Sequence, residues 1–131
     1  MGLLRILAVT LDVPEDAVNS EMSRQCRILS SRPHPPHSAP PSPGQLRTGA
    51  HTDFGAMTIL AMTDADGCLE VRMPDRKWLA VRPAPGTLVV NLGDMMARWT
   101  NDRWTSTLHR VANPKNLSSA RSRRQTLGAG T

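Results

Sequence analysis

The sequence predicts a mainly β fold, either a β-sandwich or a jelly roll, with a short helical segment at its N-terminus. Two observations predict it. Short strand-like runs follow one another between about residues 49 and 112, joined by turn sequences such as PDRK and PAPG. Within several of these runs, apolar and polar residues alternate. Short strands joined by turns at this frequency are typical of sandwiches and jelly rolls.

Length and composition set the domain organisation. A chain of 131 residues can form one domain with a core of its own. Aromatic residues make up only 3% of it, tyrosine is absent, and the eleven prolines cluster. We therefore expect three parts: a helical segment over residues 1–21, a Pro/Ser-rich irregular segment over residues 22–43, and a β-rich core over residues 44–131.

The first two parts follow from local patterns. Residues 3–9 are apolar with few breakers, and Pro14 is followed by two acids, as at a helix start, so two short helical pieces are expected. The stretch SSRPHPPHSAPPSPG has no period, and proline cannot donate a ladder hydrogen bond. His34 and His37 lie in this stretch, where solvated side chains are expected rather than metal ligands.

The third part contains the strands. Residues 57–62 are apolar on both faces, which predicts a central strand, whereas residues 69–73 alternate like a half-exposed one. Shorter patterns predict the remaining elements, namely a short strand over 78–82, a buried strand over 87–93, a helical turn over 94–102 with Asp94 as its cap, and a strand over 106–112. The last strand places Thr107, His109 and Val111 on one face.

Three residues of this region carry metal-binding chemistry. In an extended segment residues i and i+2 point to the same face, so His51 and Asp53 can aim at one point. His109 would come from a strand that folding brings opposite. Two histidines and one carboxylate make the facial triad of non-haem Fe(II) oxygenases, which leaves coordination positions open. The alternative is that His51 and Asp53 are a loop pair and His109 is a strand histidine without a ligand role.

The surrounding blocks resemble a known family. "PGQLRTGAHTDFGAMTIL", "TLVVNLGDMMARWTNDRWTSTLHRVANP" and "RRQT" occur in the order found in the isopenicillin N synthase-like Fe(II)/2-oxoglutarate-dependent oxygenases. The dense match runs from about Pro43 to Pro114. The resemblance implies a jelly roll, the double-stranded β-helix, and a dioxygenase core over residues 44–131.

The resemblance also implies a ligand set. Fe(II) would be bound by His51, Asp53 and His109, with 2-oxoglutarate and O₂ as co-substrates. Arg124 would hold the far carboxylate of 2-oxoglutarate, because its planar fork pairs a carboxylate through two bonds, and Thr126 would add a hydroxyl. The alternative for Arg124 is a solvated arginine in a basic tail. Phe54, next to Asp53, is the candidate substrate-pocket residue.

The implied reaction is hydroxylation, desaturation or ring closure of a small molecule, with decarboxylation of 2-oxoglutarate to succinate. The chain also departs from the family pattern, since it has no tyrosine and a proline tract precedes His51. Relative to family members, we expect the N-terminal region and the final strand to be missing from this sequence. We therefore expect an incomplete barrel, irregular from Ser30 to Pro43 with an exposed edge, and an inactive fragment or a non-catalytic β-fragment or binding module remains the alternative function.

Charge and targeting features suggest few partners. The net charge of +5 is concentrated in one run, Arg121–Arg124, which is typical of a solvated tail rather than a nucleic-acid site. No secretory signal is evident, so Cys26 and Cys68 are expected to stay reduced, and no apolar run approaches the roughly 20 residues of a membrane span. We expect a cytoplasmic monomer with a small-molecule substrate, and neither a membrane nor a nucleic-acid partner.

Overall fold

The computed structural model describes residues 2–17, 26–34, 40–62, 68–113 and 122–130. In Leu4, in β8 and in most of β1 it describes the backbone alone. The elements, in chain order, are α1 (Gly2–Thr10), β1 (Cys26–His34), β2 (Thr48–His51), β3 (Met57–Met62), β4 (Leu69–Arg72), β5 (Trp78–Ala80), β6 (Leu88–Leu92), α2 (Asp94–Trp99), β7 (His109–Val111) and β8 (Ser122–Gly130).

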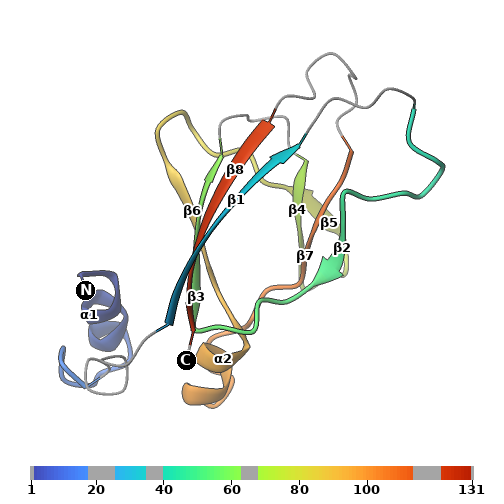
Figure 1. Cartoon of the computed structure of the whole chain (residues 1–131). Helices are drawn as coiled ribbons and strands as arrows, with labels where there is room; N and C mark the ends of the chain where they lie inside the picture. Colours follow the sequence, from blue (N-terminus) through green and yellow to red (C-terminus); the bar gives the residue numbers. More distant parts are fainter. Residues whose placement is uncertain (1, 18–25, 35–39, 63–67, 114–121, 131) are drawn as a thin grey trace.

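The strands form two antiparallel sheets of four strands each. Their orders are β1-β8-β3-β6 and β2-β7-β4-β5. Figure 1 shows the two sheets side by side, with α2 at the end where β3 begins and α1 to one side of that end, at the lower left. Apart from the consecutive pair β4 and β5, neighbouring strands within each sheet come from distant parts of the chain, as in a jelly roll. The predicted mainly β jelly roll is therefore confirmed.

The proline-rich segment departs from the prediction. The irregular structure expected for residues 22–43, and for Ser30 to Pro43 within them, is wrong where β1 forms. There Cys26–His34 pairs with β8 residue by residue, with Pro33 opposite Arg123. β1 is an edge strand, and proline is tolerated at a sheet edge because a strand with one neighbour needs only half of its N–H groups. Residues 35–39 lie outside the described part.

The strand β3 is central, as its sequence predicts. β3 pairs with β6 on one side and with β8 on the other. Its first residue, Met57, packs against α2 in a cluster with Ala56 and Met96, and Leu7 of α1 contacts the same cluster. Leu60 faces the other way and packs between the sheets with Leu69 and other residues of β4 and β7. The two faces of one strand thus contribute to both apolar clusters.

The strand β6 corrects a second expectation. It was predicted to be buried, but it is an edge strand on which Leu88 and Val90 are exposed. The predicted helical turn after it is confirmed as α2, although Asp94 does not cap it. The N-cap is Gly93, and the Asp94 carboxylate instead accepts a hydrogen bond from Thr52 at 3.1 Å.

The N-terminal segment agrees in part with its prediction. The first helical piece is α1, whereas the second is a single turn closed by a hydrogen bond from the Ala17 amide to the Pro14 carbonyl. Arg5 on α1 forms an ion pair with Glu15, which holds this turn against the helix. Residues 18–25 lie outside the described part, so the remainder of the helical segment stays a prediction.

The outer face of the β2-β7-β4-β5 sheet carries a polar cluster. Arg110 lies 4.1 Å from the Trp78 ring centroid, Arg72 lies 5.4 Å from it, and the Nε of Arg110 is 2.6 Å from a Glu70 oxygen. Contacts of this kind contribute about 0.5–1 kcal/mol each at exposed sites. They tie β4, β5 and β7 together on the face opposite the interior.

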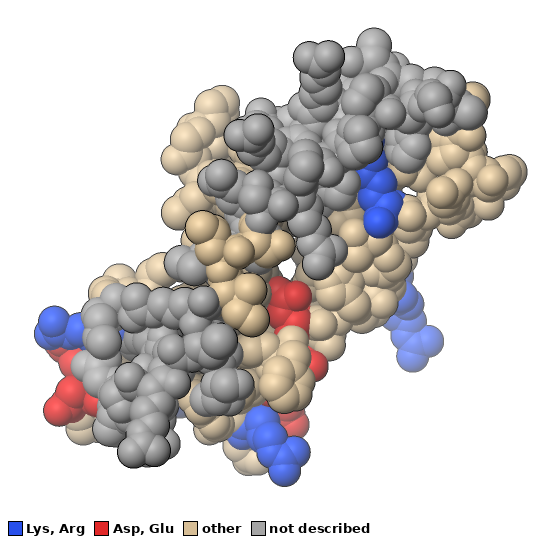
Figure 2. Space-filling model, in the orientation of Figure 1, with Lys and Arg blue, Asp and Glu red and all other residues tan. Residues whose placement is uncertain are grey.

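Charged side chains are dispersed over the face of the molecule drawn in Figure 2. On the face in Figure 2, lysine and arginine lie singly at separate places, and red and blue groups adjoin at the end occupied by α1. Neither helix of the described residues is long and apolar enough to cross a membrane.

The described core is thin. Nine apolar residues are buried, none of them a large side chain below 2% exposure, while twelve large apolar residues are exposed. Because burial of apolar area is the main stabilising contribution, we predict a free energy of unfolding at or below about 5 kcal/mol, the lower end of the usual range. Equilibrium urea unfolding followed by tryptophan fluorescence measures it. A value near about 10 kcal/mol would contradict this expectation.

Candidate metal centre

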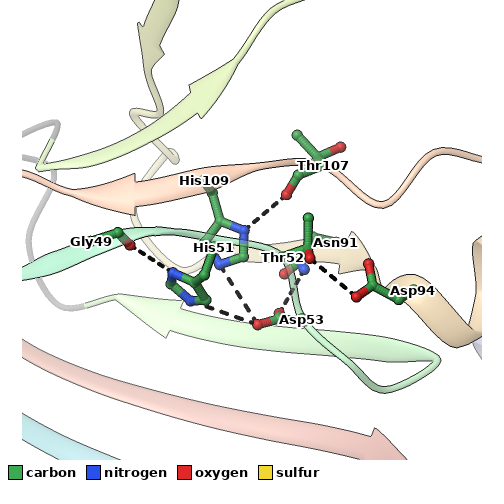
Figure 3. A network of polar contacts seen from close by, with 8 residues as sticks. All are labelled: Gly49, His51, Thr52, Asp53, Asn91, Asp94, Thr107 and His109. Carbon is green, nitrogen blue, oxygen red and sulfur yellow. Dashed lines mark hydrogen bonds and ion pairs between the residues drawn. The ribbon is translucent and has the colours of Figure 1, made fainter.

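Pairing of β2 with β7 brings the three predicted ligands together. His51 ends β2, His109 begins β7, and the two residues are direct partners in the antiparallel register. Asp53 lies two residues after His51, and its Oδ1 is 3.9 Å from Nε2 of His51 and 3.7 Å from Nε2 of His109. Figure 3 shows all three side chains converging on one point. Within the described residues they are the one cluster of potential metal ligands.

Backbone carbonyls fix the tautomers of both histidines. Nδ1 of His51 lies 2.8 Å from the Gly49 carbonyl oxygen, and Nδ1 of His109 lies 2.9 Å from that of Thr107. A carbonyl can only accept, so each Nδ1 carries the proton. In the neutral rings the lone pair is then on Nε2, which is the atom that faces Asp53.

The two oxygens of Asp53 have different surroundings. Oδ1 faces the histidines, while Oδ2 accepts a hydrogen bond of 2.7 Å from the side-chain amide of Asn91. Burial raises the pKa of Asp53, but hydrogen bonds from Asn91 and Thr58 and the two nearby histidines outweigh it, so the pKa lies below its usual value. The group is therefore a carboxylate at neutral pH, ready to act as an anionic ligand.

The loop that carries Asp53 is held by the first turn of α2. The amides of Asp94 and Met95 donate to the carbonyls of Asp53 and Phe54, at 2.8 and 3.2 Å. Gly93 approaches so closely that a Cβ at this position would lie 2.0 Å from the Gly55 oxygen and 2.5 Å from the Asp53 oxygen. The close backbone contact therefore requires glycine at position 93. The same contact fixes the position of the Asp53 backbone relative to α2.

The donor set fits a divalent transition metal. Two neutral imidazoles and one carboxylate suit Fe(II), and ligand atoms at about 2.0–2.2 Å from a metal lie about 3 Å apart when their bonds are near perpendicular. The Nε2–Oδ1 separations of 3.7 and 3.9 Å are slightly wider. Small side-chain movements would therefore close the site on an ion, with the unliganded side open to the cavity.

A cavity of about 220 Å³ lies between the sheets and ends at the triad. Leu60, Leu69, Val71, Val89 and Val111 give it an apolar wall. The polar residues on its wall, apart from the triad, are Ser30, Thr48, Thr58, Asn91 and Thr107. Thr107, His109 and Val111 all line it, which confirms that the three side chains lie on one side of this extended segment, although β7 itself begins only at His109.

The structure places the other predicted site residues less completely. Arg124 and Thr126 lie on β8, where their backbones pair with Met62 and Leu60 of β3. Their side chains fall outside the described part, so their co-substrate role stays a prediction. Phe54 is 77% exposed and lines a separate, open hollow beside α2 instead of the cavity at the triad. In this structure it does not serve as a wall of the triad cavity.

Sequence reasoning missed the residues that support Asp53. Asn91 on β6 and Thr58 on β3 are direct cross-strand partners, and both hydrogen-bond the Asp53 carboxylate. Both were visible only as polar positions inside otherwise apolar strands. A buried strand position that keeps a polar side chain needs a partner, and that signal could have pointed to them.

Comparison with known proteins identifies a match over most of the chain. The family model of the 2OG-Fe(II) oxygenase superfamily matches residues 19–125. The 2-oxoglutarate-Fe(II) type oxidoreductase hxnY of Emericella nidulans is 40% identical over 116 residues, which cover 85% of this chain and 32% of that protein. The validamycin A dioxygenase of Streptomyces hygroscopicus subsp. limoneus is 48% identical over 71 residues, covering 54% and 20%.

Solved structures show the same architecture. A full-length Neurospora crassa protein in complex with alpha-KG and thymine superposes with a TM-score of 0.84 at 31% identity, covering 97% of this chain and 40% of that one. A 2OG-Fe(II) oxygenase family protein from Caulobacter crescentus superposes with a TM-score of 0.85 at 32% identity, again covering 97% and 40%. The chain spans about a third of the length of the curated relatives that it matches over most of its own length.

The contact at Gly93 generates a prediction. Gly93→Ala should displace the Asp53 loop, because the added Cβ would overlap two backbone oxygens. Overpacking of this kind costs typically about 1–3 kcal/mol. We expect a lower melting temperature together with at least tenfold weaker Co(II) binding by calorimetry, since a misplaced ligand weakens the site by about that factor or more.

Gly49→Ala is the matched control. It lies two residues from His51, and a Cβ there meets nothing within 4 Å. It should leave Co(II) affinity and melting temperature close to those of the unsubstituted chain. If Gly93→Ala bound Co(II) as tightly as Gly49→Ala does, the loop would not depend on this contact.

Proposed function

The chain belongs to the 2OG-Fe(II) oxygenase superfamily, and we propose on this premise that it is the iron-binding core of an Fe(II)- and 2-oxoglutarate-dependent oxygenase acting on a small molecule. The observation that carries the proposal is the triad itself. His51, Asp53 and His109 turn three donor atoms toward one point at the end of a cavity. Each histidine already has the tautomer that metal binding needs.

The residues of the site would have separate roles in metal binding and in contact with the substrate. His51, Asp53 and His109 would hold Fe(II), and the metal with 2-oxoglutarate and O₂ would supply oxidation of an unactivated C–H bond, with conversion of 2-oxoglutarate to succinate and CO₂. The lowered pKa of Asp53 keeps it charged, so the ligand set brings one negative charge to the ion. The apolar wall of the cavity would contact a small molecule bound beside the triad.

The cavity supports a small substrate or co-substrate. Its volume of about 220 Å³ is below the roughly 300–1,000 Å³ of typical ligand pockets. The names and complexes of similar proteins cover chemically diverse small molecules, among them validamycin A, homoarginine and thymine. This diversity supports a small-molecule substrate for the whole protein and favours none of these compounds.

Other expectations from the sequence stay predictions. A cytoplasmic location, a monomeric state and the absence of a nucleic-acid partner have no test in the fold or the site. The same holds for the outcome of the oxidation, whether hydroxylation, desaturation or ring closure.

The first test of the proposal is formation of the Fe(II)–2-oxoglutarate chelate. Addition of Fe(II) and 2-oxoglutarate without oxygen should produce the weak visible charge-transfer band of that chelate, because the triad leaves adjacent coordination positions open. His109→Ala should abolish the band, since it removes one of three ligands. His34→Ala, which removes a histidine outside the triad, should retain it. An unsubstituted chain that binds neither component would leave only the non-catalytic β-module.

A second test concerns the co-substrate carboxylate. Arg124→Lys should weaken 2-oxoglutarate binding to the Fe(II)-loaded chain by about tenfold or more, because one ammonium group cannot reproduce a two-bond guanidinium fork. Titration of the charge-transfer band gives the affinity. Arg123→Lys makes the same chemical change one residue earlier on β8 and should have little effect. Equal affinities in the two variants would remove Arg124 from the site.

A further inference from the structure

The geometry points to Asn91 as a positioning residue that holds one oxygen of Asp53 away from the metal, so that Asp53 binds as a monodentate ligand. The inference rests on the proposed function, because it concerns how the same triad takes up Fe(II). Asn91 touches neither histidine in any hydrogen bond of the described residues. Its effect on the metal is therefore exerted through Asp53.

The first step is the asymmetry of the carboxylate. Oδ1 of Asp53 is the atom nearest to both Nε2 atoms, at 3.7 and 3.9 Å. Oδ2 is 2.7 Å from Nδ2 of Asn91, a short hydrogen bond between a neutral amide donor and a charged acceptor. Figure 3 shows Asn91 and the two histidines on different sides of the Asp53 carboxylate.

The second step is the rigidity of the donor. Asn91 lies inside β6 and pairs directly with Thr58 of the central strand β3. Both side chains line the cavity, and both hydrogen-bond Asp53. The Asp53 carboxylate is therefore held by two residues of the opposite sheet. Asp53 itself comes from the loop after β2. The ligand is therefore clamped between the two sheets.

The third step is what the clamp prevents. A carboxylate free to rotate can bring both oxygens to a metal and occupy two coordination positions instead of one. With two histidines, a bidentate aspartate would leave fewer positions for a chelating co-substrate and O₂. A hydrogen bond that holds Oδ2 keeps the coordination number of the protein ligands at three, which the proposed chemistry needs.

The test compares three variants of the full chain. Asn91→Leu keeps most of the side-chain volume without the donor, and Thr58→Val keeps the shape of Thr58 without its hydroxyl. Asn113→Ala is the matched control, because Asn113 donates an amide hydrogen bond of the same 2.7 Å length to the Gln45 carbonyl, away from the triad. Co(II) affinity is measured by calorimetry, and melting temperature confirms that each variant is folded.

A second readout separates positioning from general stability. The infrared difference spectrum between the Co(II)-loaded and metal-free chain, labelled with ¹³C at aspartate carboxylates, reports the gap between the antisymmetric and symmetric stretches. This gap is wide for a monodentate carboxylate and narrow for a bidentate one. A purely structural role of Asn91 would lower the melting temperature and leave the gap unchanged.

We expect the dissociation constant for Co(II) to rise by about 10–100-fold in Asn91→Leu, the usual effect of losing a partner of a metal ligand. The stretch gap should narrow in the same variant, and Thr58→Val, which removes the other hydrogen-bond donor to Asp53, should weaken Co(II) binding by less. If Asn91→Leu does not fold, Asn91→Ala, which also removes the donor, decides in its place. Asn113→Ala should keep wild-type affinity and an unchanged gap. The same result in a folded Asn91 variant would overturn the inference, whereas a wild-type chain that binds no Co(II) would overturn the proposed function itself.

Discussion

The pairing of β2 with β7 is the interaction on which the site depends. It places His51 directly opposite His109, although the two residues are far apart in the chain. The ring centroids are then 4.3 Å apart. These strands are short and their register shifts between Thr48 and His51, so the pairing is held by its neighbours as well as by its own hydrogen bonds. One such support is the Arg47 amide, just before β2, which donates to the Val111 carbonyl of β7 at 2.9 Å.

Asp53 is positioned by a different means, because it follows β2 in a loop and belongs to neither sheet. Its backbone is fixed by the amides at the start of α2, and its carboxylate is fixed by Asn91 and Thr58. The metal centre thus combines two ligands set by strand register with a third set by helix contact and side-chain hydrogen bonds. Each ligand is thus fixed by contacts of its own, independently of the extent of the apolar core.

Much of the site followed from the sequence, because its geometry is periodic. The i, i+2 spacing of His51 and Asp53 and the strand pattern around His109 were enough to predict convergence on one face. The contacts that fix Asp53 are not periodic, since Asn91 is 38 residues away and meets it only after the sheets are formed. Asp94 was expected to cap its own helix and instead accepts from Thr52. The strand β1 was missed because proline argues against a strand, and edge position, which relaxes that argument, is a property of the sheet.

The carbonyl partners of the histidines have a further consequence, for how such a fold diversifies. Each imidazole is oriented by the main chain two residues before it, on its own strand. Because these partners are main-chain carbonyls, they are kept when other side chains around the cavity are substituted. The orientation of the two imidazole rings does not depend on those side chains. The cavity residues Leu69, Val71 and Val89 can therefore vary in size and shape to suit a new ligand, while the orientation of the two histidine ligands is retained. One backbone arrangement can in this way be retained by proteins with very different organic substrates.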